Sequence, residues 1–68
     1  MTENMDADPF NLSLRKFLKQ LGVTSQRAIE EAVAKGDLRG KGRLTVRAVV
    51  TAEGTDLRHV VEGDIDLG

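Results

Sequence analysis

The sequence contains no cysteine, and its aromatic content is only 3%, from two phenylalanines. Without cysteine the chain can form neither a disulfide scaffold nor a thiolate-ligated metal or iron-sulfur site. The sequence therefore gives no direct indication of the redox compartment. The scarcity of aromatic rings removes the stacking platforms on which single-strand nucleic-acid binders rely.

Neither sign of charge dominates, and no long apolar run is present. Ten Lys and Arg residues stand against 11 Asp and Glu, a formal net charge of -1, so no global attraction to nucleic acid or anionic lipid is expected. No segment could span a membrane, and residues 1–8 are acidic and polar, unlike a secretory signal. We expect a soluble, cytoplasmic protein.

The length of 68 residues predicts one small domain over residues 8–68, preceded by a disordered tail over residues 1–7 in which Met5 is a candidate start. At 40% hydrophobic and 31% charged, the chain is apolar enough to fold. A core of this size contributes roughly 3–5 kcal/mol unless a metal, a disulfide or a second subunit reinforces it. Self-association is therefore an early hypothesis.

Helical periodicity predicts two short helices, over about 9–21 and 25–35. Asp8 and Pro9 are typical of a helix start. Gly22 is expected to end the first helix in a left-handed conformation, with Thr24 capping the second and Gly36 ending it. The expected apolar stripe of the first helix consists of Phe10, Leu14, Phe17, Leu18 and Leu21, and the expected buried edge of the second consists of Ala28, Ile29, Ala32 and Val33.

From Arg43 onward apolar residues alternate, which predicts an antiparallel β-hairpin over about 43–52 and 56–66, with Glu53-Gly54 at the turn. The predicted fold class is therefore α+β. Pairing about that turn places Ala52 opposite Thr55 and then, outward, Val50 opposite Leu57, Ala48 opposite His59, Val46 opposite Val61, Leu44 opposite Gly63, Thr45 opposite Glu62 and Arg43 opposite Asp64. A lone hairpin is marginal in water, so its apolar face is expected to pack on the helices or on a second copy.

No catalytic residues, metal ligands or cofactor are predicted. His59 has no second histidine or cysteine to complete a metal site or triad, and we expect it to be partly buried on the inner face of the hairpin. Glu62, Asp64 and Asp66 alternate along the last strand without the spacing of a calcium loop, which favours cross-strand charge pairs. We therefore expect that the protein is not an enzyme.

Two sets of residues are candidates for binding. The candidate protein-partner surface consists of Leu12, Arg15, Lys16, Lys19, Val49 and Val60, and the candidate anion contacts are Lys35, Arg39, Lys41, Arg43 and Arg47. Leu12 is singled out because it departs from the apolar stripe and lies among cations, and the two valines because they interrupt a charged strand face. Whether the basic residues converge on one face stays open.

One family resemblance rests on the stretch from Phe10 to Val33, which reads FNLSLRKFLKQLGVTSQRAIEEAV. It resembles a family of short bacterial proteins classed as a domain of unknown function. The end of the chain, Gly63-Asp-Ile-Asp-Leu67, resembles the tail of that family more loosely. The resemblance implies a bacterial cytoplasmic protein and brings no activity or site residues with it.

Two hypotheses of function follow. The first is a non-enzymatic protein–protein interaction module, either a homodimer or a small adaptor that offers its hairpin edge or first-helix face to another protein. The alternative is a small nucleic-acid-binding or regulatory domain, in which the helical joint around Gly22-Val-Thr-Ser25 imitates a helix-turn-helix and the basic 35–47 segment contacts phosphates. No membrane partner is expected.

Overall fold

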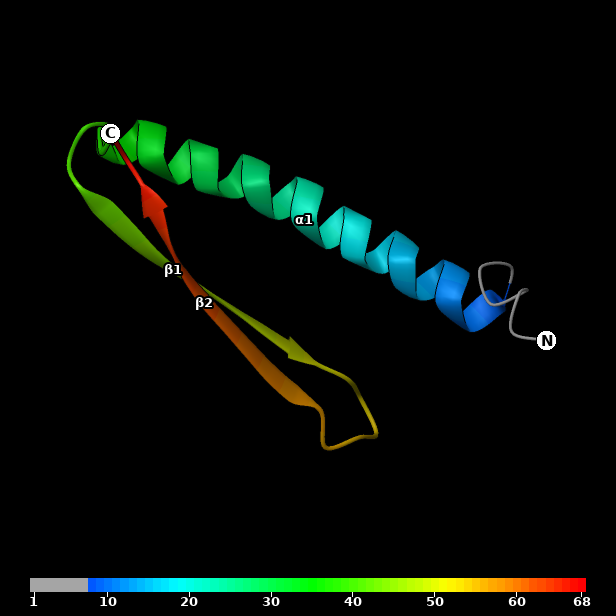
Figure 1. The fold of residues 1–68 in the computed structure, drawn as a ribbon. Helices are drawn as coiled ribbons and strands as arrows, with labels where there is room; N and C mark the ends of the chain where they lie inside the picture. Colours follow the sequence, from blue (N-terminus) through cyan, green and yellow to red (C-terminus); the bar gives the residue numbers. More distant parts are fainter. Residues whose placement is uncertain (1–7) are drawn as a thin grey trace. The chain divides into compact units, whose positions relative to one another are not determined.

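The computed structural model describes residues 8–68 and contains one helix followed by an antiparallel pair of strands (Figure 1). Helix α1 spans Pro9–Gly36, strand β1 spans Arg43–Thr51 and strand β2 spans Arg58–Asp66. The chain divides after Gly36 into two units, the second running from Asp37 to Gly68. The α+β class is confirmed, and the predicted tail over residues 1–7 lies outside the described residues.

The start of α1 follows the sequence signals. The Phe10 amide donates a hydrogen bond to Asp8 Oδ1 at 3.1 Å, and the Leu12 amide donates to the Asp8 carbonyl at 2.9 Å. Asp8 is thus the predicted N-cap, because its side chain satisfies one of the amides that the first turn leaves unpaired. Pro9 occupies the first helical position, where a missing N–H costs no hydrogen bond.

The prediction of two helices is wrong, because α1 runs without interruption for 28 residues through Gly22 and Thr24. The φ of Gly22 is not positive, so this residue does not end a helix in the left-handed region. The Thr24 hydroxyl donates to the Gln20 carbonyl at 2.8 Å, one helical turn back, instead of capping a new helix. A single glycine costs a helix interior only about 1 kcal/mol, which the surrounding helix-forming residues offset.

Helix α1 ends at Gly36, as predicted, but the left-handed residue is the one after it. Asp37 has a φ of 54°. Aspartate tolerates this conformation better than most residues with a side chain, and it occupies the place that glycine usually takes after a helix. The loop that follows contains Gly40 and Gly42 with φ of 80° and 95°, and both positions favour glycine for the same steric reason.

The two strands pair in a register offset by two residues from the predicted one. Val49 lies opposite Val60, and Thr51 opposite Arg58 forms the last pair before the turn. Residues that were expected to pair have other partners: Val50 faces His59, Ala48 faces Val61, Thr45 faces Asp64 and Arg43 faces Asp66. A shift of two keeps every side chain on its predicted face, because strand side chains alternate with a period of two.

The turn explains the offset. The Thr55 amide donates to the Ala52 carbonyl at 3.3 Å, and Gly54 has a φ of 79°, so Glu53 and Gly54 are the turn centre, as predicted. The type I′ turn of a two-residue hairpin requires a positive φ at both centre positions, and Glu53 does not have one. The strands therefore do not pair directly beside the turn, and residues 52–57 form a six-residue connection.

Hydrogen bonds tie the end of the chain to the loop before β1. The Leu67 amide donates to the Gly42 carbonyl at 2.8 Å, and the Gly40 amide donates to the Leu67 carbonyl. The Gly68 amide donates to Asp66 Oδ1 at 2.9 Å. Leu67, held by these bonds, is one of two buried hydrophobic residues among residues 8–68, the other being Val33 of α1.

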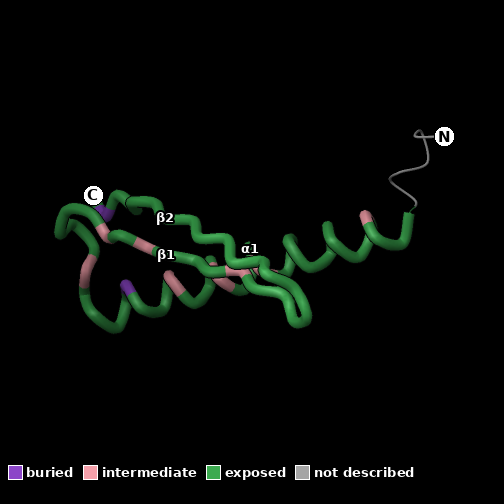
Figure 2. Tube along the Cα trace, turned by 90° about the horizontal axis from the view of Figure 1, so that it is seen from below, coloured by how far each residue is buried: buried purple, intermediate pink, exposed green. Residues whose placement is uncertain are grey.

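Most of the described chain is exposed, as Figure 2 shows. Of the edge predicted to be buried in the second half of the helix, Val33 is buried and Ile29 is intermediate, while Ala28 and Ala32 are exposed. On β1 the predicted alternation is visible, since Leu44, Val46 and Val50 are intermediate between exposed neighbours. His59, expected to be partly buried, is exposed.

Candidate functional site

The most extended apolar surface of the described residues follows α1 over almost its whole length. A helix advances about 100° per residue, and at that angle most of the apolar positions of both halves of α1 fall within one face about 120° wide, with Leu12, Val23, Val33 and Ala34 outside it. We call this face the apolar stripe; it consists of Phe10, Leu14, Phe17, Leu18, Leu21, Ser25, Ala28, Ile29 and Ala32. The stripe is continuous only because the helix is.

The large side chains in the N-terminal part of the stripe are exposed, while Leu21 and Ile29 are intermediate. Phe10 is 66% exposed, Phe17 50%, Leu18 48% and Leu14 40%. Leaving a Leu or Phe side chain in water instead of burying it costs about 1.5–3 kcal/mol, so a run of half-exposed side chains on one face is unfavourable. Contiguous exposed apolar surface of this kind is typical of an interaction site.

Side-chain size changes along the stripe. Its N-terminal half carries leucines and phenylalanines, whereas its C-terminal half carries Ser25, Ala28 and Ala32, with Ile29 as the larger exception. Charge also differs between the halves, because Arg15, Lys16 and Lys19 precede Gly22 with no acidic residue among them. After Gly22, Glu30 and Glu31 are balanced by Arg27 and Lys35. A second helix that lies against the stripe therefore meets a bulky half and a thin half, and only the bulky half of the helix carries a net positive charge.

The predicted partner residues on α1 lie elsewhere on the helix. Leu12, Lys16 and Lys19 lie on the face opposite the stripe, and Arg15 lies at its flank. Leu12 is 51% exposed, as the prediction of a surface leucine requires. It is separated by about half a turn from the larger apolar surface, so these residues do not extend the stripe.

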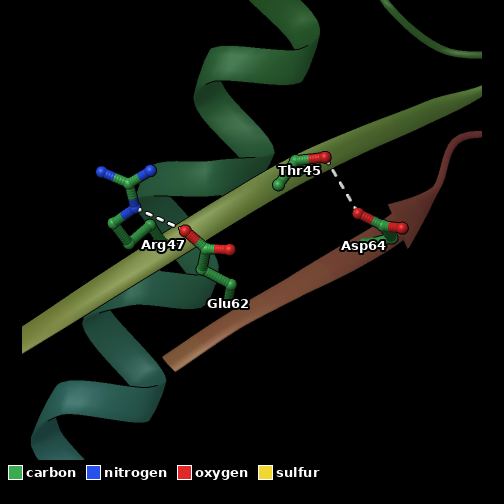
Figure 3. Close-up of polar contacts among 4 residues, drawn as sticks. All are labelled: Thr45, Arg47, Glu62 and Asp64. Carbon is green, nitrogen blue, oxygen red and sulfur yellow. Dashed lines mark hydrogen bonds and ion pairs between the residues drawn. The ribbon is translucent and has the colours of Figure 1, made fainter. Parts of the chain in front are cut away.

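The other two predicted partner residues form a direct cross-strand pair. Val49 is 47% exposed and Val60 is 40% exposed, and they are opposite each other in the β1–β2 register. Their neighbours on the same face are polar: Arg47 Nε donates to Glu62 Oε2 at 2.8 Å, and Thr45 Oγ1 donates to Asp64 Oδ1 at 2.9 Å (Figure 3). The pair is therefore a small apolar area beside a charged one.

The predicted anion contacts are distributed over three segments. Lys35 lies in the last turn of α1, Arg39 and Lys41 lie in the loop before β1, and Arg43 and Arg47 share one face of β1. On that face Arg47 is paired with Glu62, and Arg43 lies opposite Asp66. Glu62 thus neutralises Arg47 directly, while Asp66 is the cross-strand neighbour of Arg43 without an ion pair to it.

Candidate metal ligands do not gather anywhere in the part of the chain that the structure describes. Over residues 8–68, no three His, Asp or Glu side chains come together in a way that could hold a metal ion. His59, on the inner face of the hairpin, lies opposite Val50. Within the same residues no helix is both long enough and apolar enough to cross a membrane.

The helix-turn-helix joint predicted around Gly22 is absent from the described chain, because residues 22–25 are helical. That correction also reveals the stripe, which the division into two helices concealed. A signal was available: the residues at 14, 18, 21, 25, 28 and 32 keep the alternating spacing of four and three residues across Gly22. This spacing is the heptad pattern of helices that pair with other helices.

Comparison with known proteins identifies the family and no activity. A model of a family of unknown function (DUF6494) matches residues 5–68, so the chain belongs to that family. The resemblance found in the sequence is thereby confirmed. No curated protein and no solved structure matches the chain.

Proposed function

We propose that this family member is a non-enzymatic protein–protein interaction module that binds a second copy of itself through the apolar stripe of α1. The observation that supports the proposal is the exposure of Phe10, Leu14, Phe17 and Leu18, which follow one another on a single face of one continuous helix. Pairing of two such faces removes this surface from water. Each half-exposed Leu or Phe that becomes buried contributes about 1 kcal/mol.

The heptad spacing supports a helix as the binding partner. From Leu14 to Ala32 these positions follow one another over nearly three heptads, with Ser25 as the polar exception. A helix of 28 residues is about 42 Å long, which gives the contact a length of several turns.

A second copy is the partner that the stripe fits best, because its two halves complement each other. The bulky half can lie against the thin half of another copy, and the basic half then lies against a half without net charge instead of against another basic half. Association also fits the small number of buried side chains, because Val33 and Leu67 are the buried hydrophobic residues of the described chain. Chains of this size are commonly stabilised by oligomerisation.

The experiment that tests this proposal is sedimentation equilibrium of the full chain over a wide concentration range. The informative variant is Leu14→Gln, in the stripe, and the matched control is Leu12→Gln, two residues away on the opposite face. We expect Leu14→Gln to raise the dissociation constant of the dimer at least about tenfold, because each dimer loses two leucines from the interface. We expect Leu12→Gln to leave it unchanged.

The other results are equally informative. A wild-type chain that stays monomeric at every concentration would refute the proposal. A dimer weakened by Leu12→Gln and not by Leu14→Gln would place the interface on the predicted surface around Leu12. A dimer insensitive to both, and weakened by Val49→Lys with Val60→Lys, would place it on the hairpin, where strand addition is the expected mode.

The cellular setting is part of the proposal. We expect the module to act in the cytoplasm of a bacterium, which the family resemblance implies. Fractionation of cells that express the full chain at its native level tests the compartment.

Nucleic-acid binding stays a prediction with less support than before. One of its two grounds, the helix-turn-helix joint, is wrong for the described residues, and on β1 the arginines face carboxylates. A titration with duplex DNA at low salt tests it. Movement of the amide resonances of residues 35–47, reversed by added salt, would revive it.

A further inference from the structure

We infer that the two copies of α1 pair antiparallel and that the twofold axis crosses the pair at the level of Val23. This inference rests on the proposed self-association and adds the orientation and register of the two helices. It follows from the distribution of side-chain size along the stripe. In an antiparallel pair, residues whose numbers add up to a constant lie at the same level.

With that constant at 46, each layer of the heptad positions joins one large and one small side chain. Leu14 meets Ala32 of the second copy, Leu18 meets Ala28 of the second copy, and Leu21 meets Ser25 of the second copy. The twofold axis repeats each of these layers on the other side of the centre. The sum of the two side-chain volumes is therefore similar in all of these layers. At the flank of the contact, Phe17 lies level with Ile29 of the second copy.

A parallel pair lacks this property. It places Leu14, Leu18 and Leu21 against their own copies in one half, and Ser25, Ala28 and Ala32 against theirs in the other. The distance between packed helix axes depends on the side chains at the contact, so the bulky half would hold the axes apart while the thin half needed them close. The thin half would then contain voids, which protein interiors avoid.

Shorter antiparallel registers lose contact length. A constant of 39 joins Leu18 to Leu21 of the second copy and Leu14 to Ser25 of the second copy, but the residues of α1 after Glu30 then have no opposite helix, because α1 begins at Pro9. A constant of 46 pairs the chain from Asn11 to Lys35, which is almost all of α1. The longer overlap removes more apolar surface from water.

Electrostatics favours the same orientation. The parallel pair brings the two basic segments, each with Arg15, Lys16 and Lys19, alongside each other. The antiparallel pair avoids this repulsion, because each basic segment then lies alongside the segment in which Glu30 and Glu31 balance the later basic residues. Opposed helix directions also place the positive end of each helix dipole beside the negative end of the other. Both effects are modest on an exposed surface, so size complementarity carries the inference and charge selects in the same direction.

Pulsed electron paramagnetic resonance between spin labels tests the inference directly. The chain has no cysteine, so one introduced cysteine gives one label per copy. Two full-length variants suffice, Val23→Cys near the centre and Ala34→Cys near the end, both at exposed positions away from the stripe. With a rise of about 1.5 Å per residue, the two Val23 sites lie at the same level and the two Ala34 sites lie about 33 Å apart along the axis.

The expected result is a short distance between labels at position 23 and a distance longer by more than about 10 Å at position 34. Equal distances at both positions would show a parallel pair and overturn the inference, while leaving self-association intact. A long distance at position 23 would show a different antiparallel register and overturn it as well. No dipolar interaction at either position, with a monomer in sedimentation, would refute the proposed function itself.

Discussion

Replacing Gly22 by alanine tests the continuity of α1, on which the apolar stripe depends. Gly22 lies inside the helix without a positive φ, and a Cβ at this position has no heavy atom within 4 Å. Glycine is less favourable than alanine in a helix interior by about 0.8–1 kcal/mol. The substitution therefore meets no steric obstacle, and we expect Gly22→Ala to raise the free energy of unfolding by about 1 kcal/mol.

The assay is urea and thermal denaturation of the full chain, followed by circular dichroism at 222 nm. All variants are compared at one protein concentration, because association adds to apparent stability. For a chain of this size, 1 kcal/mol corresponds to a rise in Tm of roughly 4–8 °C. The control is Gly54→Ala at the turn, where φ is 79° and alanine is strained, so the same substitution should lower the free energy of unfolding by about 1 kcal/mol.

A fall in helical signal or in Tm for Gly22→Ala would refute the reasoning. It would mean that Gly22 adopts the left-handed conformation of a helix end, as two separate helices require. The stripe would then be divided into two short segments. The opposite signs expected at Gly22 and Gly54 make the result independent of any general effect of alanine.

Three further substitutions test local features of the structure. Thr24→Ala should raise the free energy of unfolding by about 0.5 kcal/mol in the same denaturation assay, because Thr24 lies inside the helix, where alanine is the more favourable residue, and its hydroxyl bonds only to Gln20 one turn back. A fall of about 1 kcal/mol would indicate that Thr24 is an N-cap instead. Asp8→Ala should lower the helical signal and cost about 1 kcal/mol, since the bond to the Phe10 amide is lost, and Asp8→Asn should retain most of the stability. Thr55→Val should speed amide exchange in β1 and β2 by about fivefold or more. The reason is that the Thr55 hydroxyl both donates to the Ala52 carbonyl at 2.8 Å and accepts from the Leu57 amide at 3.1 Å. Unchanged exchange would show that these bonds do not stabilise the hairpin.

Signals at the ends of α1 were sufficient to place the helix boundaries. The Asp8 side chain accepts a hydrogen bond from the Phe10 amide, and this local contact does not depend on the rest of the helix. At the other end, Gly36 is followed by Asp37, which adopts a positive φ and ends the helix. The interior was not decided by such signals. Gly22 and Thr24 are compatible with a helix end and with a helix interior, and the outcome depends on whether the apolar spacing stays in phase across them.

The hairpin shows the same division. Alternation along residues 43–51 and 58–66 determines which side chains share a face, and the structure confirms those faces. The offset of two residues depends on the backbone conformation at Glu53, which alternation does not report. Glu62 accordingly pairs with Arg47, whereas the predicted register placed Glu62 opposite Thr45.

The sequence by itself determined the fold class, the ends of the helix, the turn centre and the faces of the strands, because each of these depends on residues close together in the chain. It also indicated the family. Only the structure decided that α1 is one helix, and with it that Phe10, Leu14, Phe17 and Leu18 form part of one long exposed stripe. The physical reason is that exposure depends on which surfaces the rest of the chain covers, and no local pattern contains that information. The phase of the apolar spacing across Gly22 is present in the sequence, but the local signals at Gly22 and Thr24 fit a helix end and a helix interior equally well.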